Sequence, residues 1–215
     1  VNGLRRARNI VSYFASSGQE TAGIAEFQSR NFYGAMPDVL ALLLTQLWPT
    51  LGYDSRHLVS ALLGAAGITY TYKLGEYLGG RWVGVAAAGF LALTPMWFGY
   101  MFINPKDVPF AAALLAASYH GLRLLVDARR PSVATMIGLA VWTGALGSCK
   151  LTGVLLLGFA MQFLFGFWSL EHGRPGLARF AGRSTLAAAL GLVGIAGFAF
   201  FFWPQLFVYT PEQVV

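Results

Sequence analysis

Long apolar runs separated by short charged clusters dominate this sequence. Measured between charged residues, six runs are candidates for membrane-spanning helices, and they cover residues 58–72, 82–105, 108–122, 131–149, 151–170 and 184–211. A helix that crosses a bilayer needs roughly 17 to 25 apolar residues, because each residue advances about 1.5 Å through a hydrocarbon core about 30 Å thick. The two shorter runs reach this length if Lys73 and Arg123 extend their charges to an interface. The pattern therefore predicts an all-α, polytopic membrane bundle with about six spanning helices.

The first 55 residues follow a different pattern. The apolar stretch 39–50 is too short to cross a bilayer and begins after Pro37, so we expect an interfacial or re-entrant helix there. Residues 1–14 combine three arginines with apolar side chains and predict a helix on the membrane surface, whereas 15–30 is small and polar like a loop. We assign three regions: 1–55 as an outer region of surface helices, 56–211 as the transmembrane bundle, and 212–215 as an outer tail.

The composition excludes a soluble domain. Of the 215 residues, 56% are hydrophobic and 11% are charged, whereas a soluble domain carries about 25% charged residues. The net charge of +6 would suit a nucleic-acid partner, but the charges lie in short clusters between apolar runs, as membrane topology requires. We therefore expect membrane lipids, and no nucleic acid, as partners. The single cysteine, Cys149, cannot form an internal disulfide and is expected to be a buried, inert thiol.

The basic residues in the connections predict an orientation. The first, third and fifth connections together hold eight Lys or Arg residues, and the second and fourth hold only Lys106 and Lys150. Cytoplasmic connections carry the excess of basic residues, so we expect Lys106, Lys150 and the segment before residue 58 to face outward. No apolar run or signal peptide precedes these outward residues. We therefore expect a first spanning helix ahead of Val1, and a truncated tail after residue 211.

The connection between the second and third runs holds the most specific candidate site. It reads Asn104-Pro105-Lys106-Asp107-Val108-Pro109, and its two prolines restrict the backbone on either side of Lys106 and Asp107. A carboxylate at the mouth of a helical bundle can orient a hydroxyl-rich substrate, accept a proton or bind a cation. The alternative is that the two charges pair with lipid headgroups or with each other.

Three basic residues on the same outer side are candidates for binding a lipid phosphate. Lys150 interrupts an otherwise continuous apolar stretch and lies among small and hydroxyl residues, which suits a phosphate. Arg56 and His57 stand at the outer start of the first run, and an arginine can hold a phosphate with two parallel hydrogen bonds. Simple anchoring at the interface is the alternative for all three. We interpret His120 and His172 as structural and Asp54 as a helix cap.

The motifs of soluble enzymes are missing from the sequence. It has no Rossmann glycine fingerprint, Walker A loop, HExxH pair or GxSxG turn, which removes nucleotide-sugar Rossmann chemistry and ATP-driven transport. A small-solute transporter is disfavoured because no charged group lies in the middle of a run and no interrupted helix pair is apparent. Enzymes acting on lipid-borne substrates, carriers and scaffolding subunits remain.

Four short segments resemble one enzyme family. They read Asn-Phe-Tyr-Gly at 31–34, Tyr-Asp-Ser-Arg-His at 53–57, Leu-Gly-Gly at 78–80 and Phe-Ile-Asn-Pro-Lys-Asp-Val-Pro-Phe at 102–110. Together they resemble bacterial integral-membrane glycosyltransferases of family 39, relatives of protein O-mannosyltransferases and of the lipid A aminoarabinose transferase. The similarity runs from about residue 31 to residue 204. It implies a C-type glycosyltransferase fold, with two surface helices in an outer first loop and a donor sugar carried on a polyprenyl phosphate.

The resemblance also assigns roles to individual residues. It implies an inverting transfer at the outer face of the bacterial cytoplasmic membrane, in which Asp107 matches the family's second acidic position. Arg56 matches the arginine that starts the second helix, and Lys150 matches a basic residue at the outer end of the fifth. The family's main catalytic acid would precede Val1, and Glu20 and Glu26 lie too late to replace it.

Two hypotheses follow from the sequence. The first is a lipid-linked-sugar glycosyltransferase in which Asp107 orients the substrate and Lys150, Arg56, His57, Lys106 and Asn104 bind it. The second is a non-catalytic subunit of a larger membrane complex that has kept the family's helices. The sequence specifies no cofactor. It leaves open whether a divalent cation binds, because a single outer carboxylate is too few to define a cation site.

Overall fold

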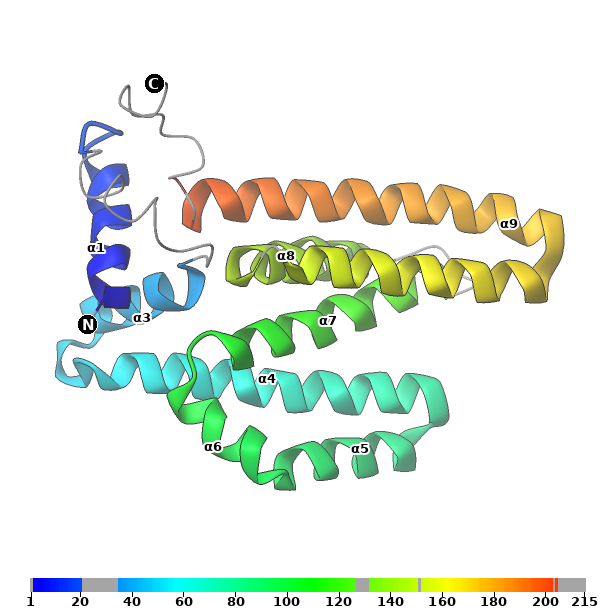
Figure 1. Ribbon diagram of the computed structural model, residues 1–215, viewed down its shortest axis with the longest axis horizontal. Helices are drawn as coiled ribbons and strands as arrows, with labels where there is room; N and C mark the ends of the chain where they lie inside the picture. The colour runs from blue at the N-terminus through cyan, green and yellow to red at the C-terminus, as the bar shows by residue number, and fades with distance from the viewer. Residues whose placement is uncertain (1, 21–34, 127–131, 151, 203, 205–215) are drawn as a thin grey trace.

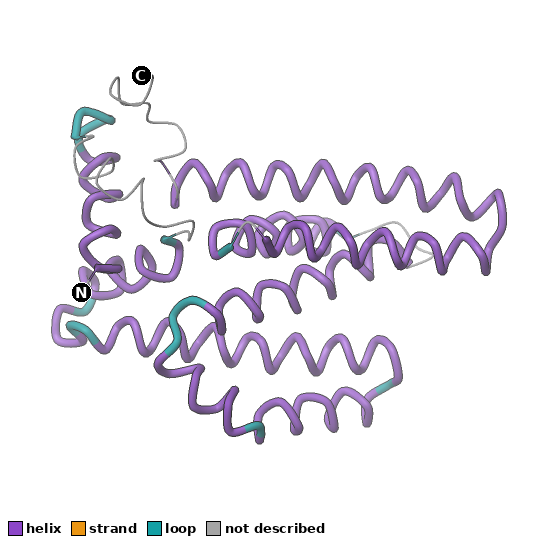
Figure 2. The backbone as a smooth tube through the Cα atoms, viewed as in Figure 1, coloured by secondary structure: helices purple, strands orange, loops and turns teal. Residues whose placement is uncertain are grey.

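The computed structural model describes residues 2–20, 35–126, 132–150, 152–202 and 204. Its long elements are helices, which confirms the predicted all-α membrane bundle (Figures 1 and 2). In chain order they are α1 (Asn2–Ala15), α3 (Met36–Leu47), a 3₁₀ turn η1 (Pro49–Leu51), α4 (Asp54–Gly79), α5 (Arg81–Leu93), α6 (Pro95–Ile103), α7 (Asp107–Val126), α8 (Val133–Cys149) and α9 (Thr152–Phe202). The motif at 31–34, most of the predicted loop 15–30 and the tail 212–215 lie outside the described residues.

Only some of these helices are long and apolar enough to span a membrane. In the described residues, two helical segments, Asp107–Leu125 and Phe180–Phe202, are long and apolar enough to cross a bilayer. The pair formed by α5 and α6 adds a third if its two bent halves count as one span. Helix α8 has 17 residues, about 25 Å at 1.5 Å per residue, which is short of a full hydrocarbon core. By length and composition, therefore, two or three of the six expected spans are found in the described residues.

The second predicted span is broken. The run 82–105 forms α5 and α6, which meet at 65°. The break lies at Pro95, which has no backbone N–H to donate and whose ring would clash with a carbonyl of the preceding turn. The capping residue Thr94 is extended, with φ of −67° and ψ of 115°. The expectation of an uninterrupted apolar span here was wrong, and so was the expectation that no interrupted helix pair occurs.

Helix α9 accounts for the last two predicted runs and doubles back on itself. Near its start, Gly153 lies against Leu146 of α8, and near its end Gly194 lies against Ala140 of the same helix. Leu146 and Ala140 are less than two turns apart, whereas a straight helix would separate Gly153 from Gly194 by about 60 Å. The helix must therefore reverse direction, and Figure 1 shows the reversal at the right.

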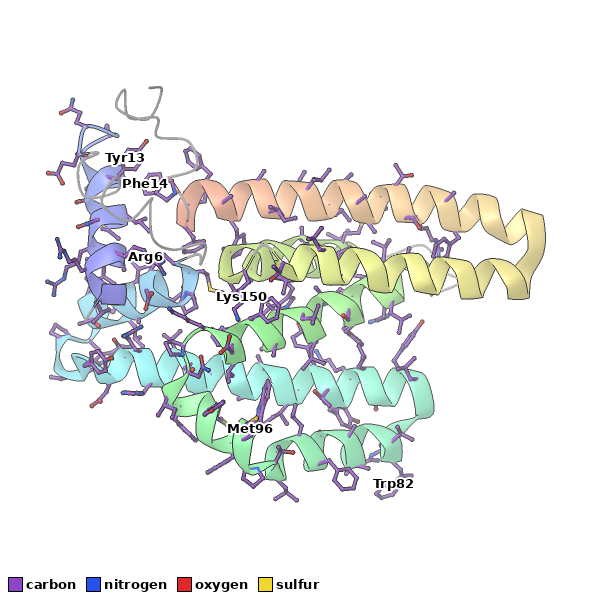
Figure 3. All side chains as sticks on the ribbon, viewed as in Figure 1. Arg6, Tyr13, Phe14, Trp82, Met96 and Lys150 are labelled. Atoms are coloured by element: carbon purple, nitrogen blue, oxygen red, sulfur yellow. The ribbon has the colours of Figure 1, made fainter. Side chains whose placement is uncertain are left out.

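The helices alternate in direction, so their ends gather at two places. The start of α4, the link between α6 and α7, and the end of α8 lie near α1 and α3, at what we call the α3 end (Figure 1). The turn at Gly80, whose φ of 87° favours glycine, lies at the far end with the last turn of α7. Figure 3 shows Arg6 and Lys150 toward the α3 end and Trp82 at the far end. The grouping matches the predicted alternation; which end faces outward stays a prediction.

The N-terminal helices pack on the α3 end. Helix α1 places Ala7 and Ile10 against Val39 and Leu42 of α3, because apolar residues recur on one of its faces at helical spacing. Phe14 also contacts Phe200 of α9, with ring centroids 5.7 Å apart. The two helices predicted near residues 1–14 and 39–50 are thus confirmed, and their position on a membrane surface stays a prediction.

The roles predicted for Asp54, His120 and His172 concern the ends and the packing of the helices. Asp54 is the first residue of α4 and makes no capping hydrogen bond, since Tyr53 holds the N-cap position without a side-chain bond. The interpretation of Asp54 as a cap was therefore wrong. His120 of α7 lies 3.2 Å from the Tyr70 hydroxyl through Nε2, a contact between neighbouring helices. The side chain of His172 lies outside the described residues.

The contact between α8 and α9 depends on Gly194. A methyl group there would overlap the carbonyl oxygen of Ala140, whereas a methyl group on Gly197 would meet nothing within 4 Å. We expect Gly194→Ala to destabilise the protein by roughly 1–3 kcal/mol through overpacking, and Gly197→Ala to be nearly neutral. Melting temperatures of the two purified variants in detergent provide the test. Equal values would mean that α8 and α9 do not pack as described.

Candidate functional site

The link between α6 and α7 is folded by the side chain of Asn104. Its Oδ1 accepts the backbone N–H of Lys106 at 3.1 Å and that of Asp107 at 2.9 Å, as an asparagine does at a turn or helix start. Its Nδ2 donates to Asp107 Oδ2 at 2.9 Å. The backbone carbonyl oxygen of Asn104 accepts a hydrogen bond from the Ser60 hydroxyl of α4 at 3.1 Å. Asn104 thus fixes the position of Asp107 at the first turn of α7.

Asp107 is paired with Lys150, which lies at the end of the neighbouring helix α8. Lys150 follows the last residue of α8 in an extended conformation, and its Nζ forms an ion pair with Asp107 Oδ1. The ammonium also lies 5.3 Å from the centre of the Phe110 ring, within range of a cation–π interaction. The Asp107 side chain remains 59% exposed, so this oriented carboxylate is still accessible to a substrate.

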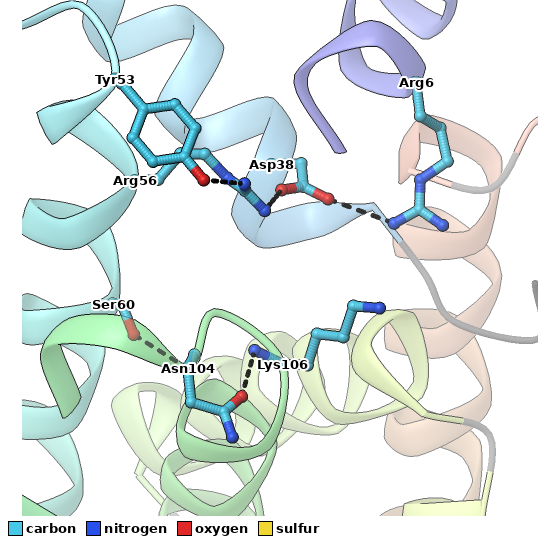
Figure 4. Close-up of polar contacts among 7 residues, drawn as sticks. All are labelled: Arg6, Asp38, Tyr53, Arg56, Ser60, Asn104 and Lys106. Carbon is cyan, nitrogen blue, oxygen red and sulfur yellow. Dashed lines mark hydrogen bonds and ion pairs between the residues drawn. The ribbon is translucent and has the colours of Figure 1, made fainter. Parts of the chain in front are cut away.

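Arg56 is held by a carboxylate that the sequence analysis did not identify. Asp38, in the first turn of α3, accepts a hydrogen bond from Arg56 at 2.7 Å and another from Arg6 of α1 at 3.2 Å. The Asp38 side chain is only 7% exposed. Arg56 also donates to the Tyr53 hydroxyl at 3.0 Å. Figure 4 shows Asp38 between the two arginines, and the cluster ties α1, α3 and α4 together.

His57 borders a small cavity beside this cluster. Its Nδ1 lies 2.7 Å from the Phe102 carbonyl oxygen near the end of α6. The cavity has a volume of about 120 Å³ and is lined by Tyr53, Arg56, His57, Phe102, Ile103 and Pro105. It therefore lies between the first turn of α4 and the link that holds Asp107, with Arg56 in its wall. A volume of this size admits a small group, such as part of a headgroup, rather than a whole lipid.

The six predicted site residues occupy one end of the molecule but form two groups. Asn104, Lys106, Asp107 and Lys150 form the first through the contacts above. Arg56 and His57 belong to the second, joined to the first by contacts of α4 with Phe102 and Asn104. Arg56 is bonded to Asp38 and not to Asp107.

The charges at this end favour an anion. On the described helices and links that meet at this end, six cationic side chains, those of Arg5, Arg6, Arg8, Arg56, Lys106 and Lys150, accompany four carboxylates, those of Glu20, Asp38, Asp54 and Asp107. The surplus of positive charge raises the local concentration of negatively charged ligands. In the described residues no group of three or more His, Cys, Asp or Glu side chains is placed to hold a metal ion.

Comparison with known families decides the classification. Residues 30–203 match the family described as dolichyl-phosphate-mannose-protein mannosyltransferase. The chain belongs to this family. Comparison with curated proteins and with solved structures finds no match. Membership confirms the resemblance noted from the four sequence segments, and it identifies the chain in general terms as a membrane glycosyltransferase-family protein whose partner is a lipid-linked sugar.

Proposed function

We propose that this protein transfers a sugar from a polyprenyl-phosphate donor to an acceptor hydroxyl at the outer face of a bacterial cytoplasmic membrane, with inversion at the anomeric carbon. The observation that supports it most is the Asp107–Lys150 ion pair, which brings a carboxylate and a cation together at the end of the bundle where positive charge is in surplus. Sugar transfer from a lipid phosphate needs both: the carboxylate near the acceptor and cations near the leaving phosphate.

Each residue has a role in this proposal. The acceptor oxygen forms a bond to the anomeric carbon, and the bond from that carbon to the phosphate oxygen breaks, with its electron pair going to the phosphate. The hydroxyl proton is taken up, in the overall balance, by the released polyprenyl phosphate. Asp107 orients the acceptor hydroxyl by accepting its hydrogen bond, and Asn104 holds Asp107 in place. Lys150 and Arg56 stabilise the charge on the departing lipid phosphate. Lys106 and His57 contact the donor from the link and from the cavity wall.

The transfer assay with Lys150→Met tests this proposal. The parent protein in vesicles should move labelled sugar from a polyprenyl phosphate to acceptors in host membranes. Methionine keeps an apolar stem against Phe110 but removes the charge, so the KM for the donor should rise about tenfold, the effect of losing one hydrogen bond to a charged group.

The matched control is Arg8→Gln, which removes an exposed cation from α1 at the same end of the bundle. Its KM should equal that of the parent. An unchanged KM for Lys150→Met would refute the phosphate-binding role. A parent protein that moves no sugar from any lipid-linked donor would favour the non-catalytic subunit instead.

A further inference from the structure

At the far end of the bundle, two cations from different helices surround one aromatic ring. Lys73 of α4 places its Nζ 5.0 Å from the centre of the Tyr70 ring and 5.8 Å from that of Tyr119. Arg123 of α7 places its Cζ 5.8 Å from the Tyr119 ring and donates to the Tyr119 hydroxyl at 3.3 Å. Tyr119 and Arg123 are four residues apart and therefore share one face of α7.

These residues lie near the far ends of their two helices. Lys73 lies six residues before the end of α4, about 9 Å along the helix, and Arg123 lies three residues before the end of α7, about 4.5 Å. All four side chains are half-buried between helices. The cluster is thus separate from the site at the α3 end, about 24 Å along α7 from Asp107.

The charge of Lys73 is not matched by a carboxylate in the part of the chain that the structure describes. Glu76, one turn further along α4, instead accepts a hydrogen bond from the Tyr72 hydroxyl at 2.6 Å. A half-buried ammonium such as that of Lys73 is unfavourable without an opposite charge beside it. An anion bound beside Lys73 would offset this cost.

We propose that Lys73, Arg123 and the Tyr119 hydroxyl bind the phosphodiester group of an anionic phospholipid. The Tyr119 oxygen accepts a hydrogen bond from Arg123 and still has its own proton to donate to a phosphate oxygen. Basic pockets between membrane helices bind anionic headgroups in this way. The proposal does not depend on the sugar-transfer reaction, since none of its residues belongs to that site.

Lipid-dependent stabilisation of the purified protein in neutral detergent tests the proposal. Phosphatidylglycerol should raise the melting temperature more than phosphatidylcholine with the same acyl chains. Lys73→Gln should weaken the apparent affinity for phosphatidylglycerol about fivefold, the effect of one basic residue near an anionic lipid. Tyr119→Phe, which keeps the ring and removes the donated proton, should also weaken it and provides the same test if Lys73→Gln does not fold.

The control is Arg81→Gln, which removes an exposed cation at the same end, from the first residue of α5. It should bind phosphatidylglycerol as the parent does. Equal stabilisation by the two lipids would overturn the proposal, and so would an equal loss in Arg81→Gln and Lys73→Gln, because both would indicate a diffuse surface charge. A stabilisation reproduced by inorganic phosphate without lipid would assign the site to free phosphate and overturn its lipid assignment.

Discussion

Asp107→Asn is expected to abolish sugar transfer while leaving the protein folded. Asparagine has nearly the same shape and keeps an oxygen that can accept a hydrogen bond from Lys150, but it loses the negative charge that orients the acceptor hydroxyl. The carboxylate is exposed to substrate and held by Asn104 and Lys150. Removing a carboxylate with this role lowers the rate by about 10²- to 10⁴-fold. The initial rate at saturating lipid-linked donor, measured with the variant in vesicles, provides the test.

Glu76→Gln is the matched control for this experiment. Glu76 is another exposed carboxylate, bonded to a side chain of its own helix and placed near the far end of α4. Its neutralisation changes the net charge equally, so transfer should continue at the parent rate. If Asp107→Asn also transferred sugar at the parent rate, Asp107 would have no part in the mechanism. Melting temperatures of both variants show whether any loss of rate comes from unfolding.

The apolar runs predicted most helices because burial in lipid imposes a length and a composition on each helix. The runs 108–122 and 131–149 correspond closely to α7 and α8. The break between α5 and α6 was missed because run boundaries were placed at charged residues, which ignores Pro95 inside an apolar run. The connection expected between the last two runs corresponds to the reversal of α9, which keeps a helical backbone from Thr152 to Phe202 and so does not appear as a separate loop.

The candidate site was predictable where its residues are neighbours in sequence. The link from Asn104 to Pro109 contains an asparagine and two prolines, residue types that are typical of a tight, fixed connection. In the structure Asn104 accepts the backbone N–H groups of Lys106 and Asp107, so the position of Asp107 is fixed as expected. The partner of Arg56 was not predictable from the pattern, since Asp38 lies 18 positions earlier and Arg6 lies 32 positions before Asp38. The available signal was a single carboxylate in the otherwise apolar segment that forms α3.

Asp38→Asn is expected to have the largest effect on stability. The substitution leaves the buried Arg6 and the partly buried Arg56 without the carboxylate that they share. Removing one partner of a buried ion pair costs about 3–5 kcal/mol, because a charge is left uncompensated away from water. The melting temperature should therefore fall strongly, and α1 and α3 should separate from α4. Donor binding should weaken as well, because Asp38 fixes the position of the Arg56 guanidinium.

The same cluster makes Arg6→Met the informative comparison. This variant leaves Asp38 and Arg56 as a neutral pair at 2.7 Å, so it should cost less than Asp38→Asn although it too removes a charge from the cluster. In the double variant only one arginine, Arg56, has lost its bond to the Asp38 carboxylate, instead of two, so it should melt above Asp38→Asn alone. Such a non-additive result is the signature of side chains that interact directly. If the two single effects simply added, Asp38 would not join Arg6 to the bundle, and the orientation of Arg56 would need another cause.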